Sequence, residues 1–532
     1  MGQATSSSLQ KANSHQRTLR IGLWQEPDNL NAYLTWMASG VWLGSLCLEP
    51  LVRPDERGVF HPVLAERVPS LENGDVAPDG LTVTYHLRRG VYWMDGQPFT
   101  SRDVRATWET LANPEHQVIS REGFEWIRAI DCPDEHTAVL RFSRSFPPFR
   151  VLFLCVYPEH KMQHLAADFT SDPYHYAPLG TGPYRLDEWK HGEHLTFVAN
   201  PLYRGPVPYF QRLEFLSVAD RSDMVSLLAQ QNLDLGLQCR VDDLLHAEQY
   251  SNLVPMVTPT SIMERVVFNQ RHSALADVRV RRALELATDK QRIVNEQLLR
   301  YSRVVTSELD GTSWANPSLT ASPFAPEKAE ALLDAAEWIR GADGTRQRDG
   351  QRLSLVICAT EGDPMRESVE EALQHMYAAI GVELRIQNHH SDHLFGNATD
   401  GGVLVRGEFD LAMRARGMWG DPDPNMSICY QSRWIPSEQN QGMGANFGAY
   451  HNEKVDAWLE EAQNTMDQER RKMLYRQVQK QIQEDVPAMY LFNPPNIDIS
   501  HPGLRGLRQL PYTNVWGTVW NANEWTQEET AL

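Results

Sequence analysis

Acidic and basic side chains gather in the segment 411–430, which reads LAMRARGMWGDPDPNMSICY. Arg414 and Arg416 end an apolar stretch, and Asp421 and Asp423 follow within a few residues, interleaved with two prolines. A guanidinium pair can clamp a carboxylate or a phosphate, and a carboxylate can hold an ammonium group. Three interpretations are open: a surface turn, the acid pair of an enzyme, or a charge clamp for a ligand.

The backbone around these charges limits where they point. Successive side chains of a strand alternate between its faces, so Arg414 and Arg416 are expected to share one face. The alternative for both arginines is a salt bridge to some of the many acids of the chain. Asp421 and Asp423 also fit turns in which the side chain accepts a local backbone hydrogen bond. We expect Asp421 to face a ligand and Asp423 to be structural.

A hydrolase is the competing class, with Asp421 paired to Glu408 or Asp410 as general acid and base. Two carboxylates alone are a weak signal, and the sequence contains no activated Ser or Cys triad and no metal motif that supports catalysis. The residues therefore give the hydrolase weak support, and neither a catalytic residue nor a cofactor is predicted.

The segment 388–393, NHHSDH, offers histidines that could bind nickel. Adjacent histidines on a polar loop are usually solvated, and no Cys or paired acid completes a site here. The six cysteines are scattered and have no CxxC spacing. Cys155 and Cys358 lie in apolar runs, where a thiol packs as a small hydrophobe. No metal site is predicted.

Length and charge limit the function class further. At 532 residues the chain is expected to form two to four packed units. Its 50 basic and 69 acidic residues give a formal net charge of -19, which disfavours nucleic acid as a partner. No apolar run is long enough to span a membrane. The polar segment 1–16 is expected to be a flexible tether without a signal peptide.

The N-terminus allows two forms of lipid attachment. In one hypothesis Met1 replaces a lipidated Cys that begins the native protein. In the other, Gly2 and Ser6 satisfy a short acylation pattern that also matches often by chance.

Both helices and strands are predicted to position the charged segment. The segment 81–87 alternates apolar and polar residues like a strand, and Thr100 with Asp103 makes a capping box for the next helix. Asp277 is expected to cap another helix, and 210–237 has the strand, helix, strand pattern of a βαβ unit. The chain from 493 onward is rich in Pro, Gly, Asn and Trp, and is expected to pack without regular structure. Helices and strands alternate over 278–287, 325–336, 353–359, 368–387 and 409–415.

Five stretches, in order, resemble the family 5 extracellular solute-binding proteins of ABC importers, the oligopeptide- and dipeptide-binding group. They are DGLTVTYHLRRGVYWMDGQPFTSRDV, PLGTGPYRLDEWKHGEHLTFVANPLYRG, VVFNQRHSALADVRVRRALELATDKQRIV, APEKAEALLDAAEW and NFGAYHNEKVDAWLEEAQNTMDQERRKMLYRQVQKQIQEDVPAMYLF. The likeness extends from about Thr18 to Phe492.

The resemblance implies an α/β fold of the type II periplasmic-binding-protein kind, with two lobes that close like a hinge and an extra subdomain. Hinge crossings are expected near Phe268–Gln270 and Leu491–Pro495. The implied division is a tether at 1–16, a discontinuous lobe 1 at 17–58, 177–269 and 491–532, a subdomain at 59–176 and lobe 2 at 270–490.

The resemblance also implies roles for the charged segment. In peptide-binding relatives an Asp holds the ammonium group of the ligand, and a gapped comparison gives that place to Asp421 while an ungapped one gives it to Gly420. An Arg on the corresponding strand can meet the ligand's carboxylate. The family's use of its N-terminal loop adds Trp36, for which core packing is the ordinary alternative. The predicted ligand-binding residues are Asp421, Arg414, Arg416, Trp419, Trp36 and Met418.

The expected function is that of an extracytoplasmic binding subunit, lipid-anchored in its native form. It would capture a peptide or peptide-like solute and deliver it, as a monomer, to an ABC permease. Alternatives are a non-peptide solute such as an opine, a sugar phosphate, an oligosaccharide or a nickel chelate. A ligand sensor and the hydrolase are further alternatives.

Overall fold

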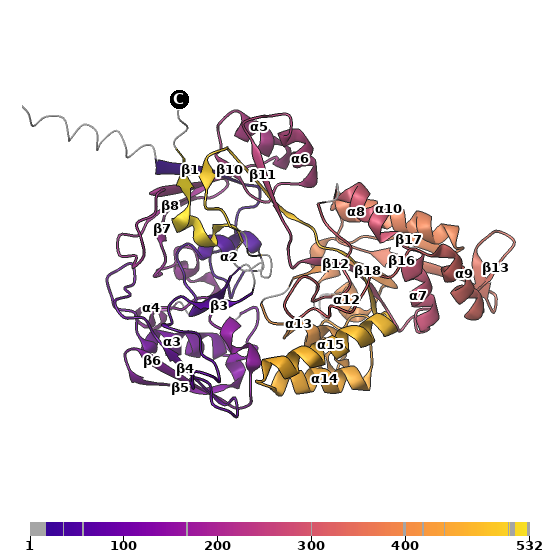
Figure 1. Ribbon diagram of the computed structural model, residues 1–532, viewed down its shortest axis with the longest axis horizontal. Coiled ribbons are helices and arrows are strands. Elements are labelled where there is room, and N and C mark those ends of the chain that lie inside the picture. Colours follow the sequence, from indigo (N-terminus) through magenta and orange to yellow (C-terminus); the bar gives the residue numbers. More distant parts are fainter. Residues whose placement is uncertain are drawn as a thin grey trace, which may run out of the picture. The chain divides into compact units, whose positions relative to one another are not determined.

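The chain forms two compact units. Unit 1 is Met1–Thr258 with Asn496–Leu532, and unit 2 is Pro259–Pro495. The computed structural model describes residues 17–35, 37–55, 58–116, 118–165, 169–298, 301–396, 401–417, 420–440, 442–508, 510 and 517–528. The chain therefore passes from one unit to the other twice, which makes unit 1 discontinuous in sequence (Figure 1).

Unit 1 is built, in its described part, on a seven-stranded sheet with the order β11-β20-β10-β1-β9-β8-β7 (Figure 1). Its strands are β1 (Thr18–Leu23), β7 (Tyr184–Lys190), β8 (His194–Ala199), β9 (Arg212–Ser217), β10 (Leu235–Gly236), β11 (Val254–Thr258) and β20 (Asn496–Ser500). β1 pairs in parallel with both β9 and β10. Because α5 (Met224–Ala229) connects β9 to β10, the predicted βαβ unit is confirmed, with β1 between its two strands.

The expectation that the chain beyond residue 493 lacks regular structure is wrong. β20 pairs in antiparallel fashion with both β10 and β11. Ile497 and Ile499 are buried and alternate in the sequence with polar residues, which is a strand pattern, although Asp498 between them is buried as well. The Pro and Asn content of the tail obscured this short alternation.

A second sheet of unit 1, with the order β4-β6-β5, is separate from the first. The strand predicted at 81–87 is β4, and the helix after the capping box is α3. The backbone N of Thr100 donates to Asp103 Oδ2 at 2.6 Å, as the capping box requires. The other α-helices and strands in the described part of unit 1 are α2 (Ala38–Gly44), β2 (Val52–Pro54), β3 (Phe60–Pro62), β4 (Thr82–His86), α3 (Ser101–Ala112), β5 (Ile127–Asp134), β6 (Thr137–Phe142), α4 (Glu159–Met162), α6 (Val241–Ala247), β21 (Leu504–Arg505) and β22 (Thr526–Gln527).

Unit 2 contains, among the residues that can be described, a five-stranded sheet with the order β17-β16-β18-β12-β19 (Figure 1). Its strands are β12 (Met263–Phe268), β16 (Ser354–Cys358), β17 (Glu383–Ile386), β18 (Leu411–Arg416) and β19 (Ala488–Phe492). β12 lies between β18 and β19 and is antiparallel to both. Unit 2 begins at Pro259, so unit 1 ends before the predicted crossing at 268–270.

Helices flank this sheet, and a small hairpin sheet accompanies it. The helices are α7 (Val278–Leu286), α8 (Lys290–Gln297), α9 (Pro326–Ala335), α10 (Pro364–Ala379), α11 (Ser391–Leu394), α12 (Val403–Arg406), α13 (Asn425–Tyr430), α14 (Glu453–Asn464) and α15 (Gln468–Asp485). The hairpin strands are β13 (Ile339–Arg340), β14 (Arg346–Arg348) and β15 (Gln351–Arg352). Asp277 caps α7 as predicted, because its side chain accepts from Arg279 N at 2.8 Å.

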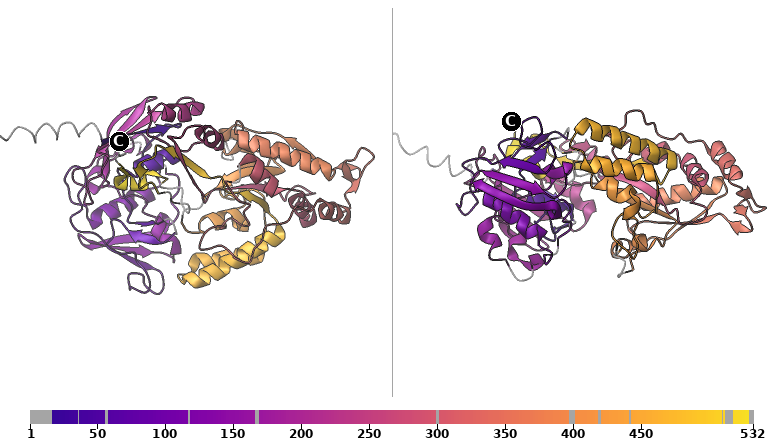
Figure 2. Two further views of the ribbon diagram at one scale, coloured as in Figure 1. Left: turned by 45° about the horizontal axis from the view of Figure 1, so that its top comes forward. Right: turned by 90° about the horizontal axis from the view of Figure 1, so that it is seen from below.

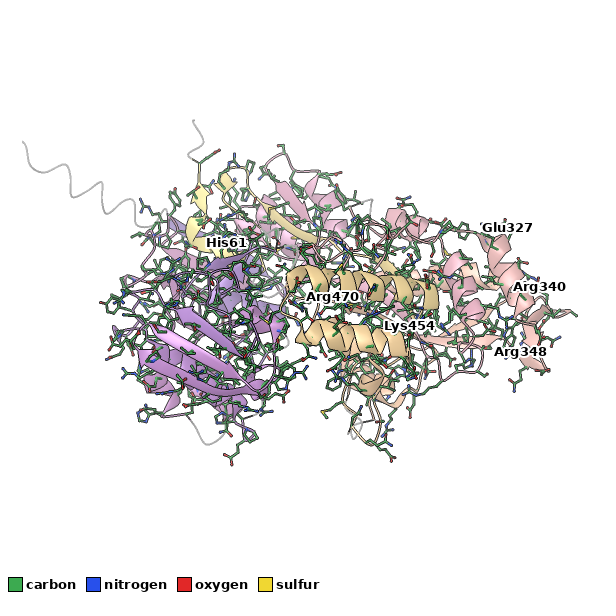
Figure 3. The ribbon with its side chains drawn as sticks, turned by 60° about the horizontal axis from the view of Figure 1, so that its bottom comes forward. His61, Glu327, Arg340, Arg348, Lys454 and Arg470 are labelled. Carbon is green, nitrogen blue, oxygen red and sulfur yellow. The ribbon has the colours of Figure 1, made fainter. Side chains whose placement is uncertain are left out.

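α14 and α15 lie side by side (Figure 2). α14 buries Val455 and Leu459, and α15 buries Leu474 and Val478, all in one core. Charged side chains such as those of Lys454 and Arg470 project from the same helices into solvent (Figure 3). No helix in the described part of the chain has the length and apolar character needed to cross a membrane.

Candidate ligand-binding site

Three arginines share one face of the sheet of unit 2. The antiparallel register places Arg265 of β12 opposite Arg414 of β18, and Met263 opposite Arg416. Directly opposite residues of such a pair point to the same face, and so do residues two positions apart on one strand. The expectation that Arg414 and Arg416 share a face therefore holds, and Arg265 joins them.

The charge of Arg265 is paired with a carboxylate, although its Nε has no hydrogen-bond partner among the described residues. Its Nη1 donates to Glu308 Oε2 at 2.8 Å and to the Tyr430 hydroxyl at 2.9 Å, and its Nη2 donates to Cys429 Sγ at 3.4 Å. Arg265 and Glu308 are both buried. Burial by itself lowers the pKa of Arg265, but the Glu308 carboxylate outweighs it, and the pKa is raised. This guanidinium is a structural cation of the core.

Arg414 has no such partner. Its side chain is buried, with 8% of the residue exposed, and no ion pair or hydrogen bond of its guanidinium occurs among the described residues. Its Nε and Nη1 are buried without an acceptor. The guanidinium lies over the ring of Phe447, 4.9 Å from its centroid, and 5.9 Å from that of Phe395.

The surroundings of Arg414 disfavour its charge. Burial, and then the positive charges of Arg265 and Arg416, lower the pKa of Arg414 well below its usual range. A buried guanidinium without a carboxylate is costly, because neither water nor a counterion stabilises it. An anion that reached this guanidinium would remove part of that cost. Arg414 is thus the basic group on this face best suited to hold a ligand's anionic group.

Arg416 is half-buried and lies two residues further along the strand. Its Nη2 donates to Asn425 Oδ1 at 2.6 Å, and Asn425 Nδ2 in turn donates to the Gly417 carbonyl at 2.7 Å. The amide thus orients the guanidinium without neutralising it. Within the described residues Arg416 has no carboxylate within ion-pair distance, so two uncompensated guanidiniums adjoin.

Asp421 is held by a cation of its own unit. Arg471 of α15 donates from Nη1 to Asp421 Oδ2 at 2.7 Å and from Nη2 to Oδ1 at 2.6 Å. Both side chains are largely buried, and this two-pronged geometry is the strongest form of such a pair. Burial alone lowers the pKa of Arg471, but the Asp421 carboxylate outweighs it and raises the pKa.

Asp423 has the structural surroundings expected for it. Its carboxylate accepts from the hydroxyls of Ser427 and Tyr475, and its backbone N donates to Asp421 Oδ1 at 3.1 Å. Burial raises the pKa of Asp423, and Arg471 at 3.9 Å opposes that rise. The two aspartates thus form a turn that is fixed to α15 through one arginine and one tyrosine.

The acid pair considered for a hydrolase is divided among other contacts. Asp410 Oδ2 accepts from Val356 N at 2.8 Å, and Glu408 is exposed, with Arg406 3.9 Å away. Asp421 is bonded to Arg471 instead. The geometry gives these three carboxylates separate partners.

Three predicted residues, Trp36, Met418 and Trp419, lie outside the described residues. The rings of His389 and His393 are 5.2 Å apart. Even so, the described part of the chain contains no group of three or more His, Cys, Asp or Glu side chains that could hold a metal ion.

Sequence reasoning missed the cations and acids that fix the site. Arg265 and Glu308 form one buried pair, and on the opposite face of β12 the carboxylate of Glu264 accepts from Arg366 Nη2 of α10 at 2.7 Å. In the sequence, the indication of these ion pairs is that Glu264 and Arg265 lie at the start of the otherwise apolar strand MERVVF. Charged residues inside a buried strand indicate ion pairs, but the sequence does not identify their partners.

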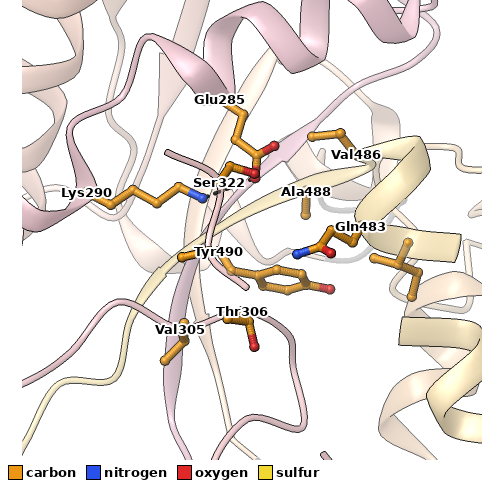
Figure 4. Close-up of a pocket in the computed structure, with 11 residues that line it drawn as sticks. Glu285, Lys290, Val305, Thr306, Ser322, Gln483, Val486, Ala488 and Tyr490 are labelled. Atoms are coloured by element: carbon orange, nitrogen blue, oxygen red, sulfur yellow. Dashed lines mark hydrogen bonds and ion pairs between the residues drawn. The ribbon is translucent and has the colours of Figure 1, made fainter. Parts of the chain in front are cut away.

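A small pocket elsewhere in unit 2 offers no comparable group. Its lining includes Glu285, Lys290, Ser322, Gln483 and Tyr490 (Figure 4). Lys290 Nζ lies 3.1 Å from Glu285 Oε1, so the two charges of the pocket compensate each other. No uncompensated charge is left there to attract a ligand.

Comparison with known proteins identifies the family. The model of bacterial extracellular solute-binding proteins, family 5, middle region, matches residues 59–436. The chain belongs to this family. The predicted resemblance and the α/β binding-protein fold are thereby confirmed.

Individual relatives of family 5 agree with this assignment. Protein XP55 of Streptomyces lividans is 28% identical over 88% of this chain and 82% of its own length. The structure of NikZ from Campylobacter jejuni in complex with Ni(L-His) is 26% identical, with a TM-score of 0.81 over 96% of this chain and 99% of that chain. The oligopeptide-binding protein AppA of Bacillus subtilis, in complex with a nonapeptide, is 21% identical, with a TM-score of 0.78 over 96% of this chain and 99% of that chain.

Proposed function

We propose that this family 5 protein is the binding subunit of an ABC importer. It captures a peptide or peptide-like solute outside the cytoplasm and delivers it to a membrane permease. Family membership supports a solute-binding role, and the named ligands of the relatives, a nonapeptide and a nickel–histidine complex, support a ligand with carboxylate groups. The chain acts without catalysis, as a monomer, and by closure of its two units.

The single observation that carries the proposal is the state of Arg414. This guanidinium is buried, has neither a carboxylate nor a hydrogen bond within the described chain, and adjoins the half-buried Arg416. Evolution of a stable core alone would favour an apolar residue or a paired charge at this place. We assign Arg414 as the main contact of the ligand's anionic group and Arg416 as its second contact. Trp36, Met418 and Trp419 stay predicted contacts.

A thermal-shift screen of the purified protein tests the proposal. The panel contains short peptides, opines, sugar phosphates and nickel chelates. A ligand that binds only the folded state stabilises it by about RT ln(1+[L]/Kd), which is roughly 2.7 kcal/mol at a hundredfold excess over Kd. We expect an anionic member to raise the melting temperature of the wild type but not of Arg414→Gln. Arg470→Gln, on the exposed side of α15, is the matched control.

Two outcomes contradict the proposal. Conversion of the stabilising ligand to a product, followed by mass spectrometry, would show an enzyme instead of a binding subunit. An equal shift in the wild type and Arg414→Gln would remove Arg414 from the site. Mass spectrometry of the protein from its native membrane tests the proposed lipid anchor separately.

A further inference from the structure

We infer that the solute is anionic and has no free ammonium group at its amino end, as in an amino-blocked peptide with a free carboxylate. This inference rests on the proposed function and adds the chemical class of the ligand. It follows from how the charges of unit 2 are already paired, in four steps.

First, the acids on this side of the β12–β18 pair, Glu308, Asp421 and Asp423, are already bonded to arginine or hydroxyl groups of the same unit. Glu308 is paired with Arg265, although its second oxygen, Oε1, accepts no hydrogen bond. Asp421 is paired with Arg471 through both of its oxygens. Asp423 accepts from two hydroxyl groups and lies 3.9 Å from the same arginine. No carboxylate of this group is left uncompensated for a ligand's ammonium.

Second, Arg471 cannot readily give up Asp421 to a ligand. Besides its two bonds to Asp421, it donates from Nε to the Ala462 carbonyl at 3.1 Å and from Nη2 to the Tyr475 hydroxyl at 3.2 Å. Its guanidinium also lies over the Trp314 ring, 5.1 Å from the centroid. A ligand ammonium at Asp421 would either leave this buried guanidinium without its carboxylate or approach a like charge, and both are unfavourable.

Third, among the described residues of this face, the charges without a partner of opposite sign are all positive. Arg414 and Arg416 lie on the same face two residues apart, and neither has a carboxylate partner within the described chain. A planar guanidinium suits a carboxylate or a phosphate. The same two charges repel an ammonium group, so they select against a cationic end as well as for an anionic one.

Fourth, the remaining buried acid of β12 points away. Glu264 pairs with Ala415 in the register and therefore lies on the opposite face of the sheet from Arg265. Its Oε1 accepts from Arg366 of α10 at 2.7 Å. Although Glu264 Oε2 accepts no hydrogen bond, the sheet separates it from the arginine face.

Alanine peptides of two to five residues test the inference in three forms. One form has an acetylated amino end and a free carboxylate, the second is unmodified, and the third has a free amino end and an amidated carboxyl end. Titration calorimetry with the wild-type protein at neutral pH measures each affinity. We expect the acetylated form to bind at least as tightly as the unmodified form, and the amidated form to bind about thirtyfold more weakly or worse, since it leaves Arg414 unpaired.

The outcomes separate the inference from the proposed function. If the unmodified or the amidated form binds about tenfold or more tightly than the acetylated form, the inference is overturned while the solute-binding role stands. If none of the peptides binds, the peptide-like ligand of the proposed function fails together with the inference.

Two variants give a second readout. Asp421→Asn is expected to keep the affinity for the acetylated peptide within about threefold, because Asp421 does not contact the solute. Arg414→Gln is expected to lose about thirtyfold or more of it. Circular dichroism confirms that each variant is folded at the temperature of the titration. A large loss in folded Asp421→Asn, with none in Arg414→Gln, overturns the inference, and the wild-type titrations decide it if Asp421→Asn does not fold.

Discussion

Arg265 and Arg414 lie directly opposite each other in the β12–β18 pair, yet within the described chain only Arg265 has a carboxylate partner. Both arginines lie on strands, point to the same face of the sheet and are buried. Glu308 neutralises Arg265. The described neighbours of the Arg414 guanidinium instead include aromatic rings and the like charges of Arg265 and Arg416. Arg265 is thus neutralised inside the fold, whereas the buried charge of Arg414 is not, which is unfavourable for stability.

Replacement of either arginine by methionine is expected to have opposite effects on the free energy of unfolding. Arg265→Met leaves Glu308 buried without its cation and should lower that free energy by about 3–5 kcal/mol. Arg414→Met removes an uncompensated charge and should raise it by about 1 kcal/mol or more in the ligand-free protein. Urea denaturation of both variants measures the difference. A similar loss in both would show that Arg414 is as structural as Arg265.

The pair of Arg471 with Asp421 is expected to contribute strongly to the stability of unit 2. Arg471→Met should lower the free energy of unfolding by about 3–5 kcal/mol, because two buried aspartates lose their cation. Adding Asp421→Asn should recover part of this loss, with a coupling energy above about 1 kcal/mol. The control is Arg470→Met, whose exposed pair with Glu461 should contribute less than about 0.5 kcal/mol. Additive effects of Arg471→Met and Asp421→Asn would refute a direct pair.

Stability is expected to fall as pH rises from about 4.5 to 7 because of Glu370 on α10. Burial raises the pKa of Glu370 to about 7, against the pull of Asn388, which donates to its Oε2. A carboxyl whose pKa is raised in the folded state binds its proton there more tightly than in the unfolded chain. Stability is therefore greatest below the unfolded pKa and is lost between about pH 4.5 and 7, by up to about 3 kcal/mol.

The variant Glu370→Gln tests this pH effect. It keeps an acceptor for Asn388 but cannot ionise, so its stability relative to the wild type should be higher at pH 8 than at pH 5. Denaturation curves at the two pH values measure the difference, with the exposed Glu371→Gln as control. If the free energy of unfolding of Glu370→Gln relative to the wild type is the same at pH 5 and pH 8, the pKa of Glu370 is not raised by burial.

Arg414→Lys is expected to fail as a conservative replacement. A lysine keeps the charge only while protonated, and burial with Arg265 and Arg416 nearby would lower its pKa far more effectively than that of a guanidinium. The affinity for an anionic solute should fall by about tenfold or more, and the loss should grow as pH rises. Titrations at pH 6 and pH 9 measure it. A constant ratio to the wild type at both values would contradict a charge-based contact.

Local features of the fold could be predicted from the sequence because their partners are near in the chain. Thr100 and Asp103 are three residues apart, and Asp277 caps the helix that begins directly after it. The strand β20 also had a local signal in the alternation around Ile497 and Ile499. That signal is short, and the surrounding Pro and Asn residues obscured it.

The partners at the site could not be predicted in the same way. Asp421 and Arg471 are 50 residues apart, and Arg265 and Glu308 are 43 apart. The chain has 69 acidic residues, and nothing local in the sequence tells which of them meets which arginine. The register of β12 against β18, set by tertiary pairing, also determines that Arg414 stays without a carboxylate. The sequence thus indicated that the charged segment is important. It did not reveal that Arg471 binds Asp421, the aspartate that was predicted to face a ligand.

A crystal structure of the complex with the acetylated alanine peptide that binds most tightly tests the central claim most directly. The account predicts that a carboxylate oxygen of the peptide lies about 3 Å from a guanidinium nitrogen of Arg414. It also predicts that Arg471 still holds Asp421 through two hydrogen bonds. A peptide bound away from Arg414, or a ligand nitrogen at Asp421 with Arg471 displaced, would contradict it.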